Sequence, residues 1–217
     1  PCDPQLKNTV HLLGFRESDL RLSWREGKVH ILKMLEGQIV TEDVQEEVGY
    51  TEEKGRKVFK PDGTYQKIAA VERHKNTGKI GVGIVKGFGL RGGAIASSVS
   101  HDSHNLIVIG DNDHDMYLAV QELLRTQGGY TLVENGQVFD TLPLPIMGLM
   151  SDAGYEKVNE KLARMIPKAH EMGIPEGFDP FITLSFMALP VIPEIRITPR
   201  GVYLTQEDRM IQSPFDR

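Results

Sequence analysis

Alternating hydrophobic and polar positions predict strands through the first third of the chain. Val29, Ile31 and Met34 alternate with polar residues, and Gly27 and Gly37 interrupt the pattern. Successive side chains of a strand point to opposite faces, so an apolar residue at every second position indicates a half-buried strand. Residues 49–66 are charged and rich in turn residues. They predict a solvated loop after the first strands.

From residue 67 the pattern changes to short apolar runs separated by glycines and polar turns. The runs KIAAV, IGVGIVK, AIASSVS and LIVIG are typical of buried strands. DNDHDMYLAVQELLRTQGG has helical spacing and predicts a helix that Asp111 or Asn112 caps and Gly128 ends. The Asn135-Gly136 pair then predicts a hairpin with a type I′ turn. The centre therefore contains a strand–helix–strand unit that leads into a hairpin.

Two further helices are expected in the last third. Ser151 or Asp152 would cap the first, and Pro167 would break or kink it. Asp179 followed by Pro180 predicts the start of a short helix. Together these elements predict an α+β domain, with a mixed, mostly antiparallel sheet covered by helices. Residues 1–28 are expected to be a polar leader or part of a preceding element, and residues 29–217 to be one domain.

Composition excludes several classes of function. The chain has 217 residues, a formal net charge of −5 and one cysteine. It has no basic block, so we expect no nucleic-acid partner. A single cysteine allows no disulfide framework within the chain, and the apolar runs are too short to cross a bilayer. We therefore expect a cytoplasmic protein. Cys2 stands in a polar leader, where we expect a frayed terminus and no catalysis.

Seven glycines lie between positions 78 and 93. They fit neither a dinucleotide fingerprint, because Lys86 stands where the third glycine belongs, nor a phosphate-binding loop, because no Gly-Lys-Ser/Thr occurs. Two interpretations stay open. The glycines allow close approach of protein backbones, or they allow the backbone to approach a ligand.

The stretch HDSHN, residues 101–105, carries the strongest candidate chemistry. Two imidazoles and a carboxylate at the mouth of an apolar strand could bind one metal ion, or Asp102 could orient a histidine for proton transfer. A third metal ligand would have to come from elsewhere, and the candidates are Glu72, His74, Asp111, Asp113 and His114. The alternative is a turn stabilised by side-chain-to-backbone hydrogen bonds, in which the histidines only pack.

The sequence also resembles a known family. The run AAVERHKNTGKIGVGIVKGFGLRGGAIASSVSHDSHNLIVIGDNDHDMYLAV, together with PLPIMGLMSD and LSFMALPVIPEIRIT, closely resembles the C-terminal domain of bacterial and archaeal adenine deaminases. The resemblance covers roughly residues 29–198. It implies hydrolysis of adenine to hypoxanthine and ammonia with manganese or iron. In that family the metal is bound mainly by an amidohydrolase barrel that precedes this domain. No His-x-His metal motif of such a barrel occurs in this sequence.

The resemblance carries the family motifs onto particular residues. At these matching positions we hypothesise a supporting catalytic role for His101, Asp102 and His104, with His101 and His104 also as possible metal ligands. We further hypothesise substrate contacts for Glu72, Arg73, Lys86 and Asn105. The expected partners are adenine, the barrel domain and further copies of the same chain, in purine catabolism and adenine salvage. The rival interpretations are a non-catalytic structural or oligomerisation module and a free-standing metal-binding hydrolase fragment.

Overall fold

The computed structural model describes residues 3–216, and its centre is a mixed sheet. The strands of this sheet lie in the order β10-β9-β7-β8-β5-β6-β1-β2. Their bounds are β1 (Val29–Met34), β2 (Thr41–Glu46), β5 (Tyr65–Val71), β6 (Ile80–Lys86), β7 (Gly93–Ser97), β8 (Leu106–Gly110), β9 (Gly129–Glu134) and β10 (Gln137–Pro143). Among these pairs, only β1 and β6 run parallel. The predicted α+β class with a mostly antiparallel sheet is confirmed.

Smaller elements complete the fold. A two-stranded sheet consists of β3 (Tyr50–Glu53) and β4 (Arg56–Phe59), and a three-stranded sheet of β11 (Ile195–Thr198), β12 (Gly201–Leu204) and β13 (Arg209–Ile211). The helices are α1 (Asp113–Thr126), α2 (Tyr155–Glu171) and α3 (Pro180–Phe186), with 3-10 turns η1 (Pro4–Lys7) and η2 (Glu17–Leu20). None of the helices in residues 3–216 is long and apolar enough to cross a membrane.

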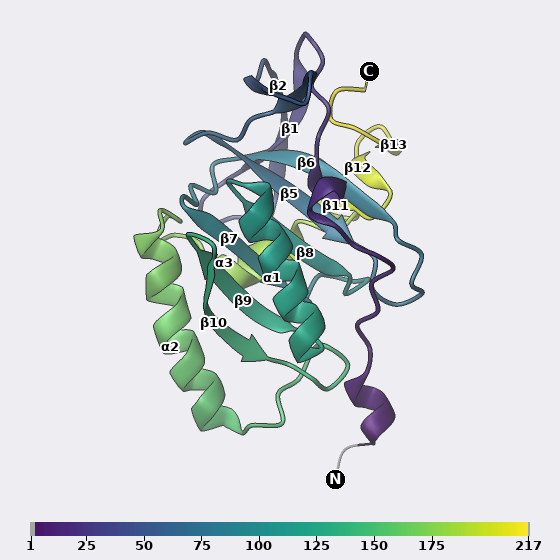
Figure 1. The fold of residues 1–217 in the computed structure, drawn as a ribbon. Helices are drawn as coiled ribbons and strands as arrows, with labels where there is room; N and C mark the ends of the chain where they lie inside the picture. The colour runs from purple at the N-terminus through teal and green to yellow at the C-terminus, as the bar shows by residue number, and fades with distance from the viewer. Residues whose placement is uncertain (1–2, 217) are drawn as a thin grey trace.

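The large sheet has a hydrophobic core on each face. Along β5, Ile68 and Ala70 belong to one core, and Ala69 and Val71 to the other. Helix α1 covers the face of Ala69, whereas α3 and the small sheet around β11 cover the opposite face (Figure 1). Because both faces are covered, β7 and β8 are buried along their whole length.

The strand–helix–strand unit and the hairpin follow the predictions. Asn112 caps α1, and its side chain accepts a hydrogen bond from the Asp115 amide at 2.8 Å. The helix connects β8 to β9, which both pair with β7. Asn135 and Gly136 have φ angles of 49° and 78°, as a type I′ turn requires.

The predicted cap of α2 is wrong, and its proline does not end the helix. Its N-cap is Gly154 and has no side-chain hydrogen bond, because the Ser151 hydroxyl accepts from the Ala153 amide and Asp152 pairs with Lys7. Pro167 lies inside the helix, which continues to Glu171. The carbonyl that loses its donor belongs to Ala163, which is exposed to solvent, so water can satisfy it.

Close backbone contacts explain the glycines of the central strands. A Cβ at Gly81 would lie 1.9 Å from the carbonyl oxygen of Thr198, and one at Gly93 would lie 2.0 Å from that of Val133. Only glycine permits these approaches, so the structure favours close packing of protein backbones at both positions.

The segment before β1 packs along the body of the domain. Val10, Leu20 and Leu22 are buried in the core on the α1 side. The expected domain boundary at residues 28–29 stays a prediction, and Cys2 lies outside the described residues.

Candidate functional site

The HDSHN loop (residues 101–105) lies directly before β8, within the connection from β7. In the sheet, Leu106 of β8 pairs with Val71 of β5, so the residues that follow Val71 lie next to the loop. The imidazole Nε2 of His74 lies 2.7 Å from the carbonyl oxygen of Ser103. The Arg73 amide donates to Oδ1 of Asn105 at 3.3 Å. The structure therefore brings residues 72–74 and 101–105 together.

Arg73 holds this cluster from inside the protein. Its side chain is buried, and its Nε donates to the carbonyl of His104 at 2.5 Å. Its two terminal nitrogens donate to the carbonyls of Thr9 and Met147, both at 2.9 Å. Burial lowers the pKa of the guanidinium to about 10. Since three carbonyls from three segments bind the guanidinium, Arg73 anchors the loop, and its contact with substrate stays a prediction.

A close approach to the Arg73 guanidinium explains one glycine of the PLPIMGLMSD motif. Gly148 has a φ of 72°, and a Cβ there would lie 2.9 Å from a terminal nitrogen of Arg73. Both the backbone conformation and the space favour glycine.

Glu72 stabilises the turn after β5. Its carboxylate accepts from the amides of His74, Lys75 and Thr77 and from the Thr77 hydroxyl, at 2.6 to 2.9 Å. Burial would raise the pKa of this carboxyl, but these hydrogen bonds outweigh burial and lower it to about 2. The predicted contact with substrate is untested, and it would have to compete with four hydrogen bonds.

The two histidines of the loop have different environments. The Nδ1 of His104 accepts from the Ser100 amide at 3.3 Å, which assigns the ring proton of the neutral form to Nε2. Burial, and then the nearby charge of His101, lower the pKa of His104. His101 is more open, with 35% of its side chain exposed, and its ring packs 5.0 Å from that of Phe186. Asp102 is 84% exposed, with Oδ1 3.8 Å from the His101 Nδ1. His101 and Asp102 are therefore the groups that the loop presents outward.

Lys86 does not join this cluster. It lies at the other end of β6 and pairs with Tyr65 in the sheet register, whereas Ile80 pairs with Val71 beside the loop. Its ammonium forms an ion pair with Glu46 at 2.7 Å. Its predicted contact with substrate is untested, but the fold places Lys86 far from the HDSHN loop.

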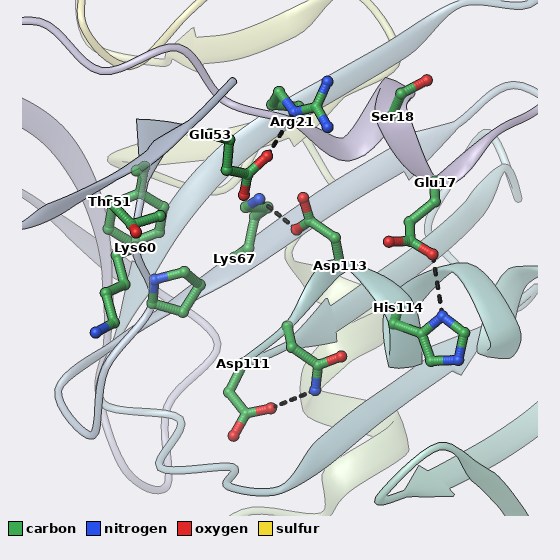
Figure 2. Close-up of a pocket in the computed structure, with 13 residues that line it drawn as sticks. Glu17, Ser18, Arg21, Thr51, Glu53, Lys60, Lys67, Asp111, Asp113 and His114 are labelled. Carbon is green, nitrogen blue, oxygen red and sulfur yellow. Dashed lines mark hydrogen bonds and ion pairs between the residues drawn. The ribbon is translucent and has the colours of Figure 1, made fainter. Parts of the chain in front are cut away.

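A second polar region lies at the opposite end of β8 (Figure 2). Asp111 accepts from the amides of Gly92 and Gly93, at 2.5 and 3.1 Å. Asp113 forms an ion pair with Lys67 of β5, whose side chain is only 3% exposed. These residues line a cavity of about 370 Å³, together with residues of η2 and of the β3–β4 hairpin. We call this cavity the polar pocket.

Sequence reasoning missed Lys67. The signal that could have found it is a single lysine in an otherwise apolar strand, KIAAV, at a position that faces the α1 core. Burial lowers the pKa of Lys67 and raises the pKa of Asp113. Buried titratable groups in a cavity are typical of functional sites.

Comparison with known proteins gives the family. Residues 38–209 match the family model described as the adenine deaminase C-terminal domain. The chain belongs to this family. It is 50% identical over 212 residues to a protein named adenine deaminase from Desulfitobacterium hafniense (strain Y51), a match that covers 98% of this chain and 37% of that protein. It is 44% identical over 203 residues to an adenine deaminase of Nitratidesulfovibrio vulgaris (strain DP4), covering 93% and 35%. It is 43% identical over 180 residues to the adenine deaminase of Bacillus subtilis (strain 168), covering 82% and 30%.

This member of the adenine deaminase C-terminal domain family spans about a third of the length of these relatives. The resemblance stated from the sequence is confirmed. The family match therefore identifies this domain, and not the activity, substrate or partners of a whole enzyme.

The residues described in this domain do not form a metal site by themselves. Within residues 3–216 no group of three or more His, Cys, Asp or Glu side chains could hold a metal ion. Of the proposed third ligands, Glu72 and Asp111 bind backbone amides, and Asp113 and His114 lie at the polar pocket. A metal role for His101 and His104 stays a prediction that requires ligands from outside these residues.

Proposed function

We propose that this chain is the C-terminal portion of an adenine deaminase, in which water hydrolyses adenine to hypoxanthine and ammonia. The family match and the names of the relatives support this proposal. The manganese or iron that the resemblance implies would be held by the remainder of the enzyme. The present domain would support and close the active site and would be inactive alone.

The observation that best supports this proposal is the way in which the HDSHN loop is held. Its backbone is anchored from inside by Arg73, while His101 and Asp102 point outward. Catalytic groups work best on a preorganised backbone, because a misplaced group loses most of its effect.

Exposed apolar side chains surround the loop and support an interface at this end of the sheet. Val191 is 78% exposed and shares a hollow of about 300 Å³ with Asp102 and Ser103. Ile182 is exposed on α3, whose Ser185 carbonyl accepts from the His101 amide at 2.9 Å. Met147 is also exposed, beside the carbonyl that binds Arg73. Apolar side chains gathered around a polar group are typical of a protein–protein contact.

In this proposal the catalytic part of the enzyme covers these apolar side chains. His101 and Asp102 would then face the mouth of the adenine pocket. There His101 holds or passes a proton, His104 fixes the ring of His101 by edge contact at 5.5 Å between centroids, and Asn105 borders the substrate.

The test uses the full-length enzyme with His101→Ala and His104→Ala. We expect kcat/KM for adenine to fall about a hundredfold or more for His101→Ala, the usual effect of losing a positioned proton-transfer group. His170→Gln, on α2, is the matched control. Bound metal, measured in the same samples, reports separately on a ligand role. If kcat/KM and metal content of both alanine variants equal those of the wild type, the loop is a structural turn and the rival structural module is supported.

The same proposal places the enzyme in the cytoplasm, in purine catabolism and adenine salvage, as an assembly of identical chains. The net charge of −5 and the single cysteine are compatible with that compartment. Light scattering of the purified enzyme measures the assembly.

A further inference from the structure

The polar pocket lies between three segments that are distant in sequence. The turn η2 contributes Glu17, the β3–β4 hairpin contributes Glu53, and the first turn of α1 contributes Asp113. Two ion pairs connect these walls at the rim. Arg21 Nε lies 2.9 Å from Glu53 Oε2, and His114 Nδ1 lies 3.0 Å from Glu17 Oε2 (Figure 2).

At the floor of the pocket, Lys67 and Asp113 keep unused hydrogen-bonding capacity. Asp113 Oδ1 is the one hydrogen-bond partner that the Lys67 ammonium has within residues 3–216, although an ammonium has three N–H donors. The second oxygen of Asp113 has no protein donor in the same residues. Figure 2 shows both groups directed into the cavity. Two N–H donors of Lys67 and one oxygen of Asp113 therefore lie side by side without a hydrogen-bond partner among residues 3–216.

The charges around the pocket argue against a highly charged ligand. Four carboxylates and three cationic side chains line it, so their charges nearly cancel. Glu17 and Glu53 are already paired at the rim. Phe59 and Pro61 form an apolar part of the pocket wall. Neither a polyphosphate nor a polyamine would find a field of one sign here.

A structural role alone does not account for this arrangement. A buried ion pair contributes little net stability, because desolvation of the two charges offsets their attraction. Two apolar side chains of similar volume would connect β5 to α1 equally well. The pair instead lines a cavity of about 370 Å³, which is large enough for a small organic molecule.

We propose that the polar pocket binds a small neutral ligand with an amide or lactam edge. Such an edge has an N–H donor beside a hydrogen-bond acceptor. The acceptor would receive a hydrogen bond from Lys67, and the N–H would donate to the free oxygen of Asp113. Both hydrogen bonds involve a charged protein group, and such bonds are stronger than those between neutral groups. This site is distinct from the HDSHN loop, which lies at the other end of β8.

The test compares two probes on the full-length enzyme by calorimetric or ligand-observed NMR titration. Benzamide has the donor and the acceptor, whereas methyl benzoate has the same ring and the acceptor but lacks the donor. We expect benzamide to bind at least about tenfold more tightly than methyl benzoate, the usual effect of one charge-assisted hydrogen bond. Equal binding of the two probes, or binding of neither, would overturn the proposal.

Variants locate the binding. Asp113→Asn keeps the side-chain volume and should weaken benzamide binding about tenfold. Lys67→Met with Asp113→Leu should abolish it while the protein stays folded, because the apolar pair replaces the ion pair. His101→Ala, at the other end of β8, should leave benzamide binding unchanged. Retention of full affinity in Asp113→Asn would overturn the assignment even if the double variant fails to fold. Loss of activity in His101→Ala tests the proposed function independently.

Discussion

The two ends of strand β8 both carry charged side chains, but the protein satisfies those charges in different ways. At the loop end, backbone groups bind them: carbonyls bind Arg73, and amides bind Glu72. At the other end, Asp111 also accepts from backbone amides, but the buried Lys67 pairs with a side chain, that of Asp113. Backbone partners fix a loop and leave its outer side chains available. Side chains that pair with each other across segments can instead form the wall of a cavity.

This difference has an energetic consequence. A side-chain ion pair can be replaced as a unit by two apolar side chains, because both charges disappear together. A guanidinium bound to carbonyls cannot be replaced in that way, since the carbonyls belong to the backbone and remain. The two ends should therefore respond differently to the same kind of substitution.

The largest expected effect comes from removing either buried cation alone. Arg73→Met should lower the free energy of unfolding by about 3 kcal/mol, because three partly buried carbonyls lose their donor. Lys67→Met should cost about 3–5 kcal/mol, because it leaves the Asp113 carboxylate without its counter-charge. Denaturant unfolding followed by circular dichroism measures both.

A second substitution separates the two ends. Adding Asp113→Leu to Lys67→Met should restore most of the lost stability. No change at the side chains of His104 or Met147 should restore Arg73→Met, because these partners, like the Thr9 carbonyl, belong to the main chain. The Thr9 hydroxyl is the one side-chain partner of the guanidinium within residues 3–216. Rescue of Arg73→Met by such a side-chain change, or no rescue at Lys67, would contradict the comparison.

The sequence predicted the elements at both ends better than it predicted their partners. Alternation, capping residues and the Asn-Gly turn depend on neighbours in the chain, so α1 and the hairpin could be located. Arg73 binds the carbonyls of Thr9 and Met147, which are 64 and 74 positions away. Backbone carbonyls are present at every residue, so no residue type marks them. Lys67 and Asp113 are 46 positions apart, and only the sheet register brings them together.

The candidate site was predicted in part for the same reason. Polar residues beside apolar runs marked both segments as strand ends, but the pairing of β5 with β8 that places Arg73 beside His104 came only from the structure. Lys86 was grouped with them because it lies in the same family motif. Its strand, however, carries it to the opposite end of the sheet. Proximity within a sequence motif does not show at which end of a strand a residue lies.

An effect of intermediate size is expected from pH at the loop end. The pKa of Glu72 is about 2 in the folded protein, below its ordinary 4.5. A carboxyl with a depressed pKa adds stability above its unfolded pKa, and that stability is lost as pH falls from about 4.5 to about 2. Wild type should therefore exceed Glu72→Gln in stability at neutral pH, and the difference should shrink across this range. The comparison uses parallel unfolding curves of both proteins, and a difference independent of pH would contradict it.

The smallest expected effect concerns the rim of the polar pocket. Glu17 and His114 are both about half exposed, and their ion pair is 3.0 Å long. Exposed pairs contribute under about 1 kcal/mol, because water screens them and both side chains lose freedom. Glu17→Gln should thus change the free energy of unfolding by less than Lys67→Met does, and salt at about 1 M should remove the change. Unfolding curves at low and high salt measure this. A large loss that salt does not reduce would mean that Glu17 acts as part of the pocket floor, so that η2 is held by more than a weak surface pair.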